Sequence, residues 1–170
     1  MIAQTTSLIL RRLRQEDAAA LHPIFSDTEA TRFALYTHDT VAQTAEWVNA
    51  VRRGYEKHGF GPWCIVRKSD DAVIGYCGCG IIDVDGKTEY EIGYRVLPCY
   101  WGQGFATEAA RATLDHASRN LGFSRIVAVI QPANVASVRV AEKAGMKYER
   151  DTMFKGVLVR VYAIHGSSAG

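Results

Sequence analysis

The sequence predicts a mixed α/β fold, and three observations support this prediction. Apolar residues repeat at helical spacing in some segments and form short β-branched runs in others. Three strand-like segments in the middle of the chain are separated only by short turns, which is typical of a meander. Further along, a strand leads through a glycine-bearing loop straight into a helix. We expect residues 1–165 of the 170 to form one domain, with residues 166–170 as a flexible tail.

The first third of the chain predicts one strand and two helices. Residues 7–13 are expected to form a strand, and the basic run at 10–14, in which arginines alternate with leucines, favours one solvated face. Residues 16–26 have helical character, but Pro23 is expected to break or kink this segment. Residues 41–57 carry an apolar stripe at helical spacing and are followed by glycines, so a longer helix is expected there.

The middle of the chain predicts the three strands of the meander. These strands cover residues 63–67, 73–82 and 90–97. The turns between them fall at residues 69–71 and 83–87, where Ser, Asp and Gly cluster. Pro98 then ends the last of the three strands.

The last third predicts two helices between strands. A helix over residues 104–121 has an apolar stripe, and residues 125–130 form a β-branched strand. A short helix over 134–144 ends at a glycine, and residues 147–150 and 157–164 finish the chain as strands.

Composition excludes several classes of function. The 20 basic and 18 acidic side chains give a net charge of +2, so no strong field toward nucleic acid or membrane is expected. No long apolar run or signal segment is found, and we expect a cytoplasmic protein. The four cysteines are expected to be reduced, and they lack partners at metal-ligand spacing, so no metal site is predicted.

The strongest local signal lies between residues 91 and 109, where a strand enters a loop containing Gly102 and Gly104. This loop opens onto a helix N-terminus, whose unpaired N–H groups and positive dipole end favour a phosphate or pyrophosphate. The dinucleotide fingerprint requires Gly or Ala where Thr107 stands, and the nucleotide P-loop requires a Gly-Lys that this loop lacks. A tight turn that binds nothing remains the alternative.

A second polar signal opens the helix predicted at 134–144. Asn134 and Ser137 lie one helical turn apart at its start. Asn134 is expected to cap the helix, and an amide in that position can also offer a hydrogen bond to a ligand.

These segments, taken together, resemble the GNAT acetyltransferase superfamily and, within it, the RimJ/RimL type. The similarity covers nearly the whole chain and rests on five pieces in the family's order. They are Leu8-Ile9-Leu10-Arg11-Arg12-Leu13; Phe60-Gly61-Pro62-Trp63 with Val73-Ile74-Gly75; Glu91-Ile92-Gly93-Tyr94; Tyr100-Trp101-Gly102-Gln103-Gly104-Phe105-Ala106-Thr107-Glu108-Ala109; and Asn134-x-x-Ser137 with Glu142-Lys143-x-Gly145. The resemblance implies a mostly antiparallel central sheet flanked by helices, and transfer of an acetyl group from acetyl-CoA to an amine.

The resemblance also implies where acetyl-CoA would bind. The pantetheine arm would run along the strand that ends at Val96, and Asn134 would hydrogen-bond it. The pyrophosphate would lie on the backbone of the loop and the first helical turn, formed by Trp101, Gly102, Gln103, Gly104, Phe105, Ala106 and Thr107. Arg139 and Lys143 are candidates for a further phosphate contact, although a solvated helix face explains both.

Two positions depart from the superfamily pattern. Trp101 stands where most members have Arg or Gln, a replacement typical of the RimJ/RimL type. Ala141 stands where many members carry a tyrosine that protonates the leaving thiolate. Ser137 is the nearest polar substitute and is our candidate for that catalytic role.

Glu91 is the candidate general base, because it matches the catalytic-base position of some relatives and an amine must lose a proton during attack. A paired carboxylate at a strand edge is the competing interpretation. Tyr36, Trp47 and Tyr55 are candidates for the wall of the acceptor pocket, although their spacing also fits ordinary core packing.

Several alternatives remain open on the sequence alone. The acceptor is the amine of a protein N-terminus or of a small molecule, and the protein is a monomer or a homodimer. A non-catalytic CoA-binding or regulatory module is kept open by Ala141. A nucleotide-binding protein is a weaker alternative, because the P-loop lysine is missing.

Overall fold

The structure, a computed structural model, describes residues 1–166 and contains one eight-stranded sheet within them. The strands follow the order β1-β2-β3-β4-β5-β6-β8-β7 across the sheet. Every neighbouring pair is antiparallel except β5 and β6. The strands are β1 (Ala3–Gln4), β2 (Leu8–Arg12), β3 (Pro62–Arg67), β4 (Ala72–Val84), β5 (Lys87–Val96), β6 (Arg125–Ile130), β7 (Lys147–Phe154) and β8 (Val157–His165).

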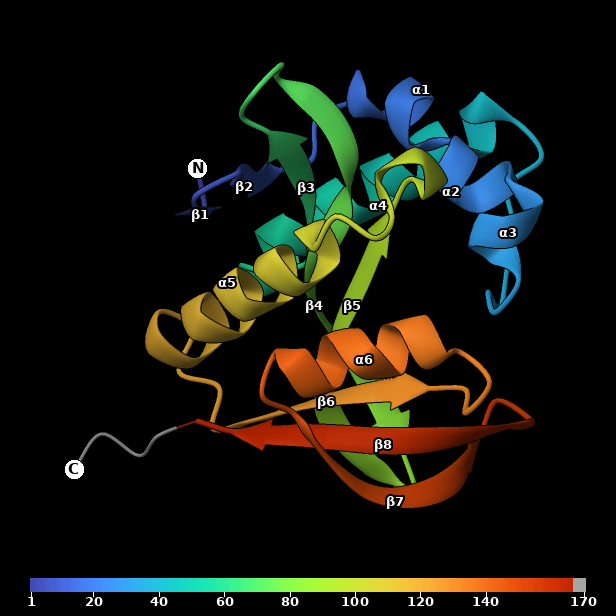
Figure 1. Ribbon diagram of the computed structural model, residues 1–170, viewed down its shortest axis with the longest axis vertical. Coiled ribbons are helices and arrows are strands. Elements are labelled where there is room, and N and C mark those ends of the chain that lie inside the picture. Colours follow the sequence, from blue (N-terminus) through green and yellow to red (C-terminus); the bar gives the residue numbers. More distant parts are fainter. Residues whose placement is uncertain (167–170) are drawn as a thin grey trace.

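Helices cover both faces of this sheet (Figure 1). α5 and α6 pack on one face through a core that includes Ile92, Leu114 and Ala141. α1, α2 and α4 pack on the other face through a second core that includes Phe25 and Trp63. The helices are α1 (Asp17–Leu21), α2 (Pro23–Ser26), α3 (Thr28–Thr31), α4 (Val41–His58), α5 (Phe105–Arg119) and α6 (Val135–Lys143), with a 3-10 turn, η1, at Pro98–Tyr100. The predicted mixed, mostly antiparallel sheet with flanking helices is confirmed.

The sheet opens where β5 and β6 run side by side. Only one residue pair joins them, Glu91 with Val127, whereas β4 and β5 pair along ten residues. Parallel strands normally pair continuously, so the two strands separate beyond Glu91 toward their C-terminal ends. This separation leaves an opening between two central strands of an otherwise continuous sheet.

Several elements differ from the sequence prediction for local reasons. Pro23 breaks the segment 16–26 into α1 and α2, as expected, and stands at the first turn of α2, where a missing N–H costs nothing. The β4–β5 hairpin closes on Asp85 and Gly86 alone, which have φ of +53° and +73°. Such a two-residue turn lets both strands extend further into the predicted turn at 83–87.

The C-terminal strands are also longer than predicted. β7 continues to Phe154 rather than ending at Arg150, because β8 pairs with it as far as Phe154 and Val157. Gly166 donates its N–H to the carbonyl of Ser124 at 2.9 Å, so the predicted tail does not begin at this residue. The other residues of the predicted tail, 167–170, lie outside the described part of the chain.

Candidate functional site

The loop between β5 and α5 is folded back onto the end of β5. Gly102 and Gly104 have φ of +74° and +85°, a backbone conformation that side chains with a Cβ rarely adopt. The Trp101 indole Nε1–H donates to the carbonyl oxygen of Val96 at 2.6 Å. The tryptophan that replaces the usual Arg or Gln therefore fastens the loop to the strand.

Within residues 1–166, the N-terminus of α5 has backbone donors without partners. Gly104 is its N-cap residue and supplies no capping side chain. The N–H groups of Phe105, Ala106 and Thr107 lie in the first turn, where no helical carbonyl can reach them. A Cβ built on Gly104 meets no atom within 4 Å, so the space in front of this turn is open. This arrangement suits an anion.

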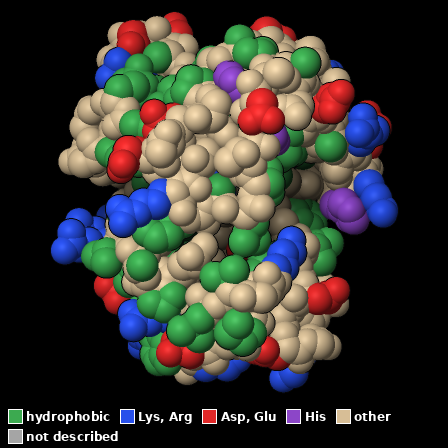
Figure 2. Space-filling model, turned by 90° about the vertical axis from the view of Figure 1, so that its right-hand side faces the viewer, with side chains coloured by type: hydrophobic (Ala, Val, Ile, Leu, Met, Phe, Trp, Pro, Cys, Tyr) green, Lys and Arg blue, Asp and Glu red, His purple; other side chains and the backbone are tan. Residues whose placement is uncertain are grey.

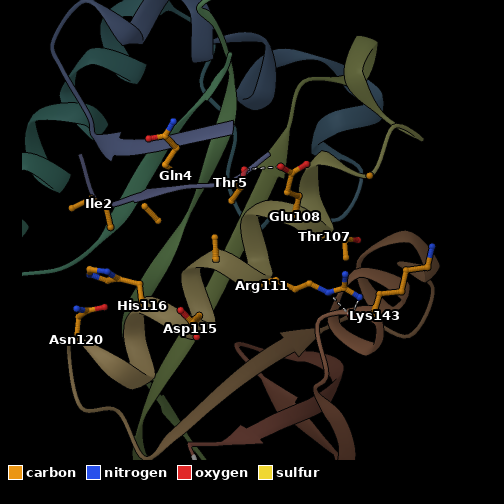
Figure 3. Close-up of a pocket in the computed structure, with 13 residues that line it drawn as sticks. Ile2, Gln4, Thr5, Thr107, Glu108, Arg111, Asp115, His116, Asn120 and Lys143 are labelled. Atoms are coloured by element: carbon orange, nitrogen blue, oxygen red, sulfur yellow. Dashed lines mark hydrogen bonds between the residues drawn. The ribbon is translucent and has the colours of Figure 1, made fainter. Parts of the chain in front are cut away.

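Glu108, the acidic residue in the first turn of α5, points toward the N-terminal segment. Glu108 accepts hydrogen bonds from the Thr5 hydroxyl at 2.6 Å and from the Ser7 N–H at 2.8 Å. Figure 3 shows its carboxylate pointing toward Thr5 on the N-terminal segment. The negative charge thus ties α5 to the N-terminal strands and leaves the helix end free for a ligand.

An outer hollow of about 820 Å³ lies along α5 beside this helix end. Arg111 donates from Nε and Nη2 to the carbonyl of Lys143, at 3.0 and 2.6 Å, and so joins α5 to α6 (Figure 3). Gly104, Thr107 and Lys143 line the hollow together with Arg111. Of the two basic candidates from the sequence, Lys143 lines this hollow and Arg139 does not. Arg111 was missed, because only folding brings it to Lys143.

The free edge of β5 leads from the loop into the sheet. Leu97 donates its N–H to Ile74 on β4 at 2.8 Å, and antiparallel pairing alternates the direction of successive backbone groups. The N–H groups of Tyr94 and Val96 consequently point away from β4, toward the side where β6 has separated. An extended ligand could pair with this edge as an added strand does.

A cavity of about 310 Å³ occupies the opening, and we call it the β5–β6 cavity. Its walls come from β5, β6, the start of α6, the segment around Phe33–Tyr36 and the β7–β8 turn. Figure 2 looks onto this side and shows a hollow between the upper and lower halves, with many hydrophobic side chains around it. Gln131 donates to the carbonyl of Phe33 at 3.1 Å and holds the loop before α4 against β6.

Glu91 lines this cavity without a polar partner. No hydrogen bond or ion pair of its carboxylate occurs within residues 1–166, whereas neighbouring Glu89 pairs with Arg125 at 3.1 Å. Burial raises the pKa of Glu91 to about 7, and the positive charge of Lys155 acts weakly in the opposite direction. A carboxylate that titrates near neutrality inside a cavity has the properties of a general base. The competing interpretation, a paired carboxylate, applies to Glu89.

The raised pKa of Glu91 predicts a pH-dependent stability difference for Glu91→Gln. The folded protein holds this proton from pH 4.5 up to about 7 while the unfolded chain has lost it, so the wild type loses stability as pH rises through that window. The variant lacks this loss, and should melt above the wild type at pH 8 and equally at pH 4. Thermal melting at both values, with Glu89→Gln as the control that breaks an ion pair instead, tests this. Equal melting at pH 8 would contradict the assigned burial.

The start of α6 closes the cavity on the other side. Asn134 caps the helix, because its side-chain oxygen accepts from the N–H of Ser137 at 3.2 Å. Tyr94 donates its hydroxyl to the carbonyl of Ser137 at 2.7 Å, and all three residues line the cavity. Ala141 is fully buried behind them. Tyr94 was missed as a site residue, although it belongs to the Glu-Ile-Gly-Tyr segment.

The three aromatic candidates separate into one cavity residue and two core residues. Tyr36 lines the cavity and is 50% exposed. Trp47 packs on Phe25 with ring centroids 4.9 Å apart. Tyr55 is buried, and its hydroxyl oxygen accepts a hydrogen bond from the N–H of Leu13 at 3.1 Å. Helical spacing therefore indicated core packing correctly for the two residues of α4.

The described residues were also expected to lack a metal site and to keep their cysteines reduced. Within 1–166 no group of three or more His, Cys, Asp or Glu side chains is placed to hold a metal ion. Cys64, Cys77 and Cys79 are buried thiols, and Cys99 is exposed. None of the helices in this range is both long and apolar enough to cross a membrane.

Comparison with known proteins identifies relatives over most of the chain. A family model described as the acetyltransferase (GNAT) domain matches residues 7–147. The uncharacterized protein YkkB of Bacillus subtilis is 36% identical over 147 residues, which cover 86% of this chain and 85% of YkkB. The uncharacterized N-acetyltransferase p20 of Bacillus licheniformis is 32% identical over 163 residues, or 93% and 91% of the two chains.

Solved structures show the same fold. A GNAT-family acetyltransferase from Bacillus anthracis superposes with a TM-score of 0.81 and 26% identity, over 97% of this chain and 98% of that one. RimL, a ribosomal L7/L12 alpha-N-protein acetyltransferase solved with coenzyme A, superposes with a TM-score of 0.77 and 21% identity, over 96% and 97%.

Proposed function

The chain belongs to the GNAT acetyltransferase family and is an acetyltransferase, and on this premise we propose that it transfers the acetyl group of acetyl-CoA to a primary amine. One observation supports the proposal above the others. An unpaired glutamate with a pKa of about 7 lines a cavity that opens on the free edge of β5, and the same strand leads to the uncapped end of α5.

The residues present fit acetyl-CoA. The N–H groups of residues 102–107 would bind the pyrophosphate, with Gly102 and Gly104 leaving room for close approach, since a Cβ on either meets nothing within 4 Å. The free edge of β5 at Tyr94 and Val96 would pair with the pantetheine arm, and Asn134 would offer its remaining amide N–H groups to the same arm. Arg111 and Lys143, which line the outer hollow, would face a further phosphate of CoA. The bound thioester supplies an activated acetyl group.

In the proposed reaction the chain contributes positioning and proton transfer. Glu91 takes a proton from the acceptor ammonium, directly or through water, because its pKa lies near physiological pH. A backbone N–H near Val96 that the pantetheine arm leaves unpaired would steady the oxyanion that develops during attack. Ser137 remains the candidate donor toward the leaving thiolate. Tyr94 lies beside it, and burial raises the pKa of this phenol and keeps it protonated.

Acetyl-CoA is expected to stabilise the folded protein. At one hundred times its dissociation constant, a ligand that binds only the native state adds about 2.7 kcal/mol. For a chain of this length that corresponds to roughly 5–10 °C in melting temperature. Thermal shift at millimolar acetyl-CoA measures it, and ATP at the same concentration is the control for general phosphate binding. An unchanged melting temperature would contradict the proposed cofactor site.

The activity itself is tested by release of the CoA thiol. A panel of short peptides with different N-terminal residues and a panel of small primary amines would be compared at fixed acetyl-CoA concentration. Acetylation of at least one amine above the hydrolysis background is the expected result. Binding of acetyl-CoA without transfer to any of them would instead favour a CoA-binding regulatory module.

A further inference from the structure

Arg95, on β5, has a buried guanidinium nitrogen without a hydrogen-bond acceptor within residues 1–166. It lies opposite Tyr76 of β4 and lines the β5–β6 cavity, on the same strand as Glu91. Its Nη1 atom is buried, and within residues 1–166 no acceptor reaches it. The other partly buried guanidinium groups have acceptors: Arg11 is held by Asp17 at 2.7 Å, and Arg125 by Glu149 at 2.7 Å.

Aromatic rings surround the guanidinium and provide no counter-charge. Its central carbon lies 5.9 Å from the ring centroid of Phe25, at the outer limit of a cation–π contact. His38 stacks on Phe25 at 4.1 Å, but an imidazole is neutral or positive and so cannot be a counter-ion for Arg95. Burial lowers the pKa of His38, which favours its neutral form. Tyr76, also close, is a buried phenol whose pKa burial raises.

The cavity as a whole therefore has an excess of positive charge. Its ionisable lining consists of Arg95, Lys155, Glu91 and the phenols of Tyr36, Tyr76 and Tyr94. Lys155 lies in the β7–β8 turn and lines the cavity. With Glu91 ionised, two fixed positive charges face one negative charge.

A buried guanidinium nitrogen without an acceptor is costly, since its lost hydration is not replaced by a hydrogen bond. Guanidinium groups keep their charge in proteins, and their planar fork matches the two oxygens of a carboxylate. Such a group is expected where a ligand supplies the missing anion. A buried polar group left unpaired in the free protein is also how a site rejects ligands that lack the matching group.

We propose that the acceptor is a small amine that also carries a carboxylate, with its amine toward Glu91 and its carboxylate on Arg95. This inference rests on the proposed acetyl transfer and narrows its substrate class. Glu91 and Arg95 are four residues apart on β5 and both line the cavity. The pantetheine arm would fill part of this cavity of about 310 Å³, and the space that remains suits a small zwitterion.

The test compares Arg95→Gln with the wild type on matched acceptors. Each α-amino acid is paired with its own carboxamide, which keeps the amine and removes the carboxylate charge. For each acceptor, kcat/KM of the wild type is divided by that of the variant, so that differences in amine basicity cancel. Arg53→Gln is the control, because it removes the same charge from an exposed position on α4.

Arg95→Gln should lower kcat/KM for the carboxylates by about 10- to 150-fold, the usual range for a hydrogen bond to a charged group, and by less than about threefold for the amides. Arg53→Gln should leave both unchanged. An equal effect of Arg95→Gln on both acceptors overturns the proposal. A clear preference of the wild type for short peptides or for phosphoethanolamine over free amino acids also overturns it. In that case the acceptor would belong to another chemical class.

A binding measurement separates this proposal from the proposed function. In the presence of CoA, N-acetyl amino acids should raise the melting temperature of the wild type and leave that of Arg95→Gln unchanged. Acetylation of neutral amines without any such shift would overturn the carboxylate site and leave acetyl transfer standing. The variant should fold, because it removes an unpaired buried charge, and its own melting temperature should equal or exceed that of the wild type.

Discussion

Glu91→Gln is expected to slow acetyl transfer by about 10²- to 10⁴-fold, the usual cost of losing a general base, while acetyl-CoA affinity stays unchanged. The substitution keeps the shape of the side chain and one acceptor oxygen in the cavity. It removes the group that can hold the proton of the acceptor ammonium. Transfer rates with the best acceptor, together with the acetyl-CoA thermal shift, measure both parts of this expectation.

The pKa of Glu91 also predicts the direction in which the transfer rate changes with pH. A base with a pKa of about 7 is protonated and inactive below that value and ionised above it. The wild-type rate should therefore rise as pH passes through about 7, and the rise should disappear in Glu91→Gln. Glu89→Gln is the matched control, since Glu89 is already paired with Arg125 and should leave the rate nearly unchanged. Wild-type rates for Glu91→Gln from pH 6 to 9 would show that another group takes the proton.

The elements that the sequence predicted correctly are those with strong local signals. α4 follows an apolar stripe, a capping box at Thr40 and a C-terminal Gly59, and all three can be recognised in neighbouring residues. The glycine loop before α5 is equally local, because Gly102 and Gly104 are needed wherever φ is positive. The two-residue β1 and the single-turn α3 were missed, since segments this short have no periodicity to detect.

The chemistry of the site depends on contacts that no local pattern contains. Glu89 and Glu91 are the same residue type, two positions apart on one strand, so no local pattern distinguishes them. Only the fold brings Arg125 to Glu89 and leaves Glu91 without a partner within residues 1–166. Arg95 looks like an ordinary strand residue until its buried nitrogen is found to lack an acceptor. Tyr94 meets Ser137 across 43 positions of sequence. These properties of long-range pairing and burial decide which polar residues are available for catalysis.

Gly104→Val is expected to abolish acetyl-CoA binding while the protein still folds. Gly104 has φ of +85°, and a β-branched residue held there costs roughly 1–3 kcal/mol in backbone strain. A domain of ordinary stability tolerates this loss. A Cβ at this position meets no protein atom within 4 Å, and we expect the branched side chain to enter the space in front of the α5 N-terminus that the pyrophosphate requires. Losing even two charge-assisted hydrogen bonds lowers affinity by about 100-fold or more.

Gly59→Val separates this loss of binding from simple strain. Gly59 ends α4 with φ of +82°, and a Cβ there also meets nothing within 4 Å. The two substitutions therefore impose the same backbone strain in the same open surroundings, and they differ only in proximity to the proposed site. Both variants should lose comparable melting temperature, and only Gly104→Val should lose the acetyl-CoA thermal shift. If both keep the shift, the loop before α5 is a turn without a ligand. If both lose it, the strain acts through the whole fold.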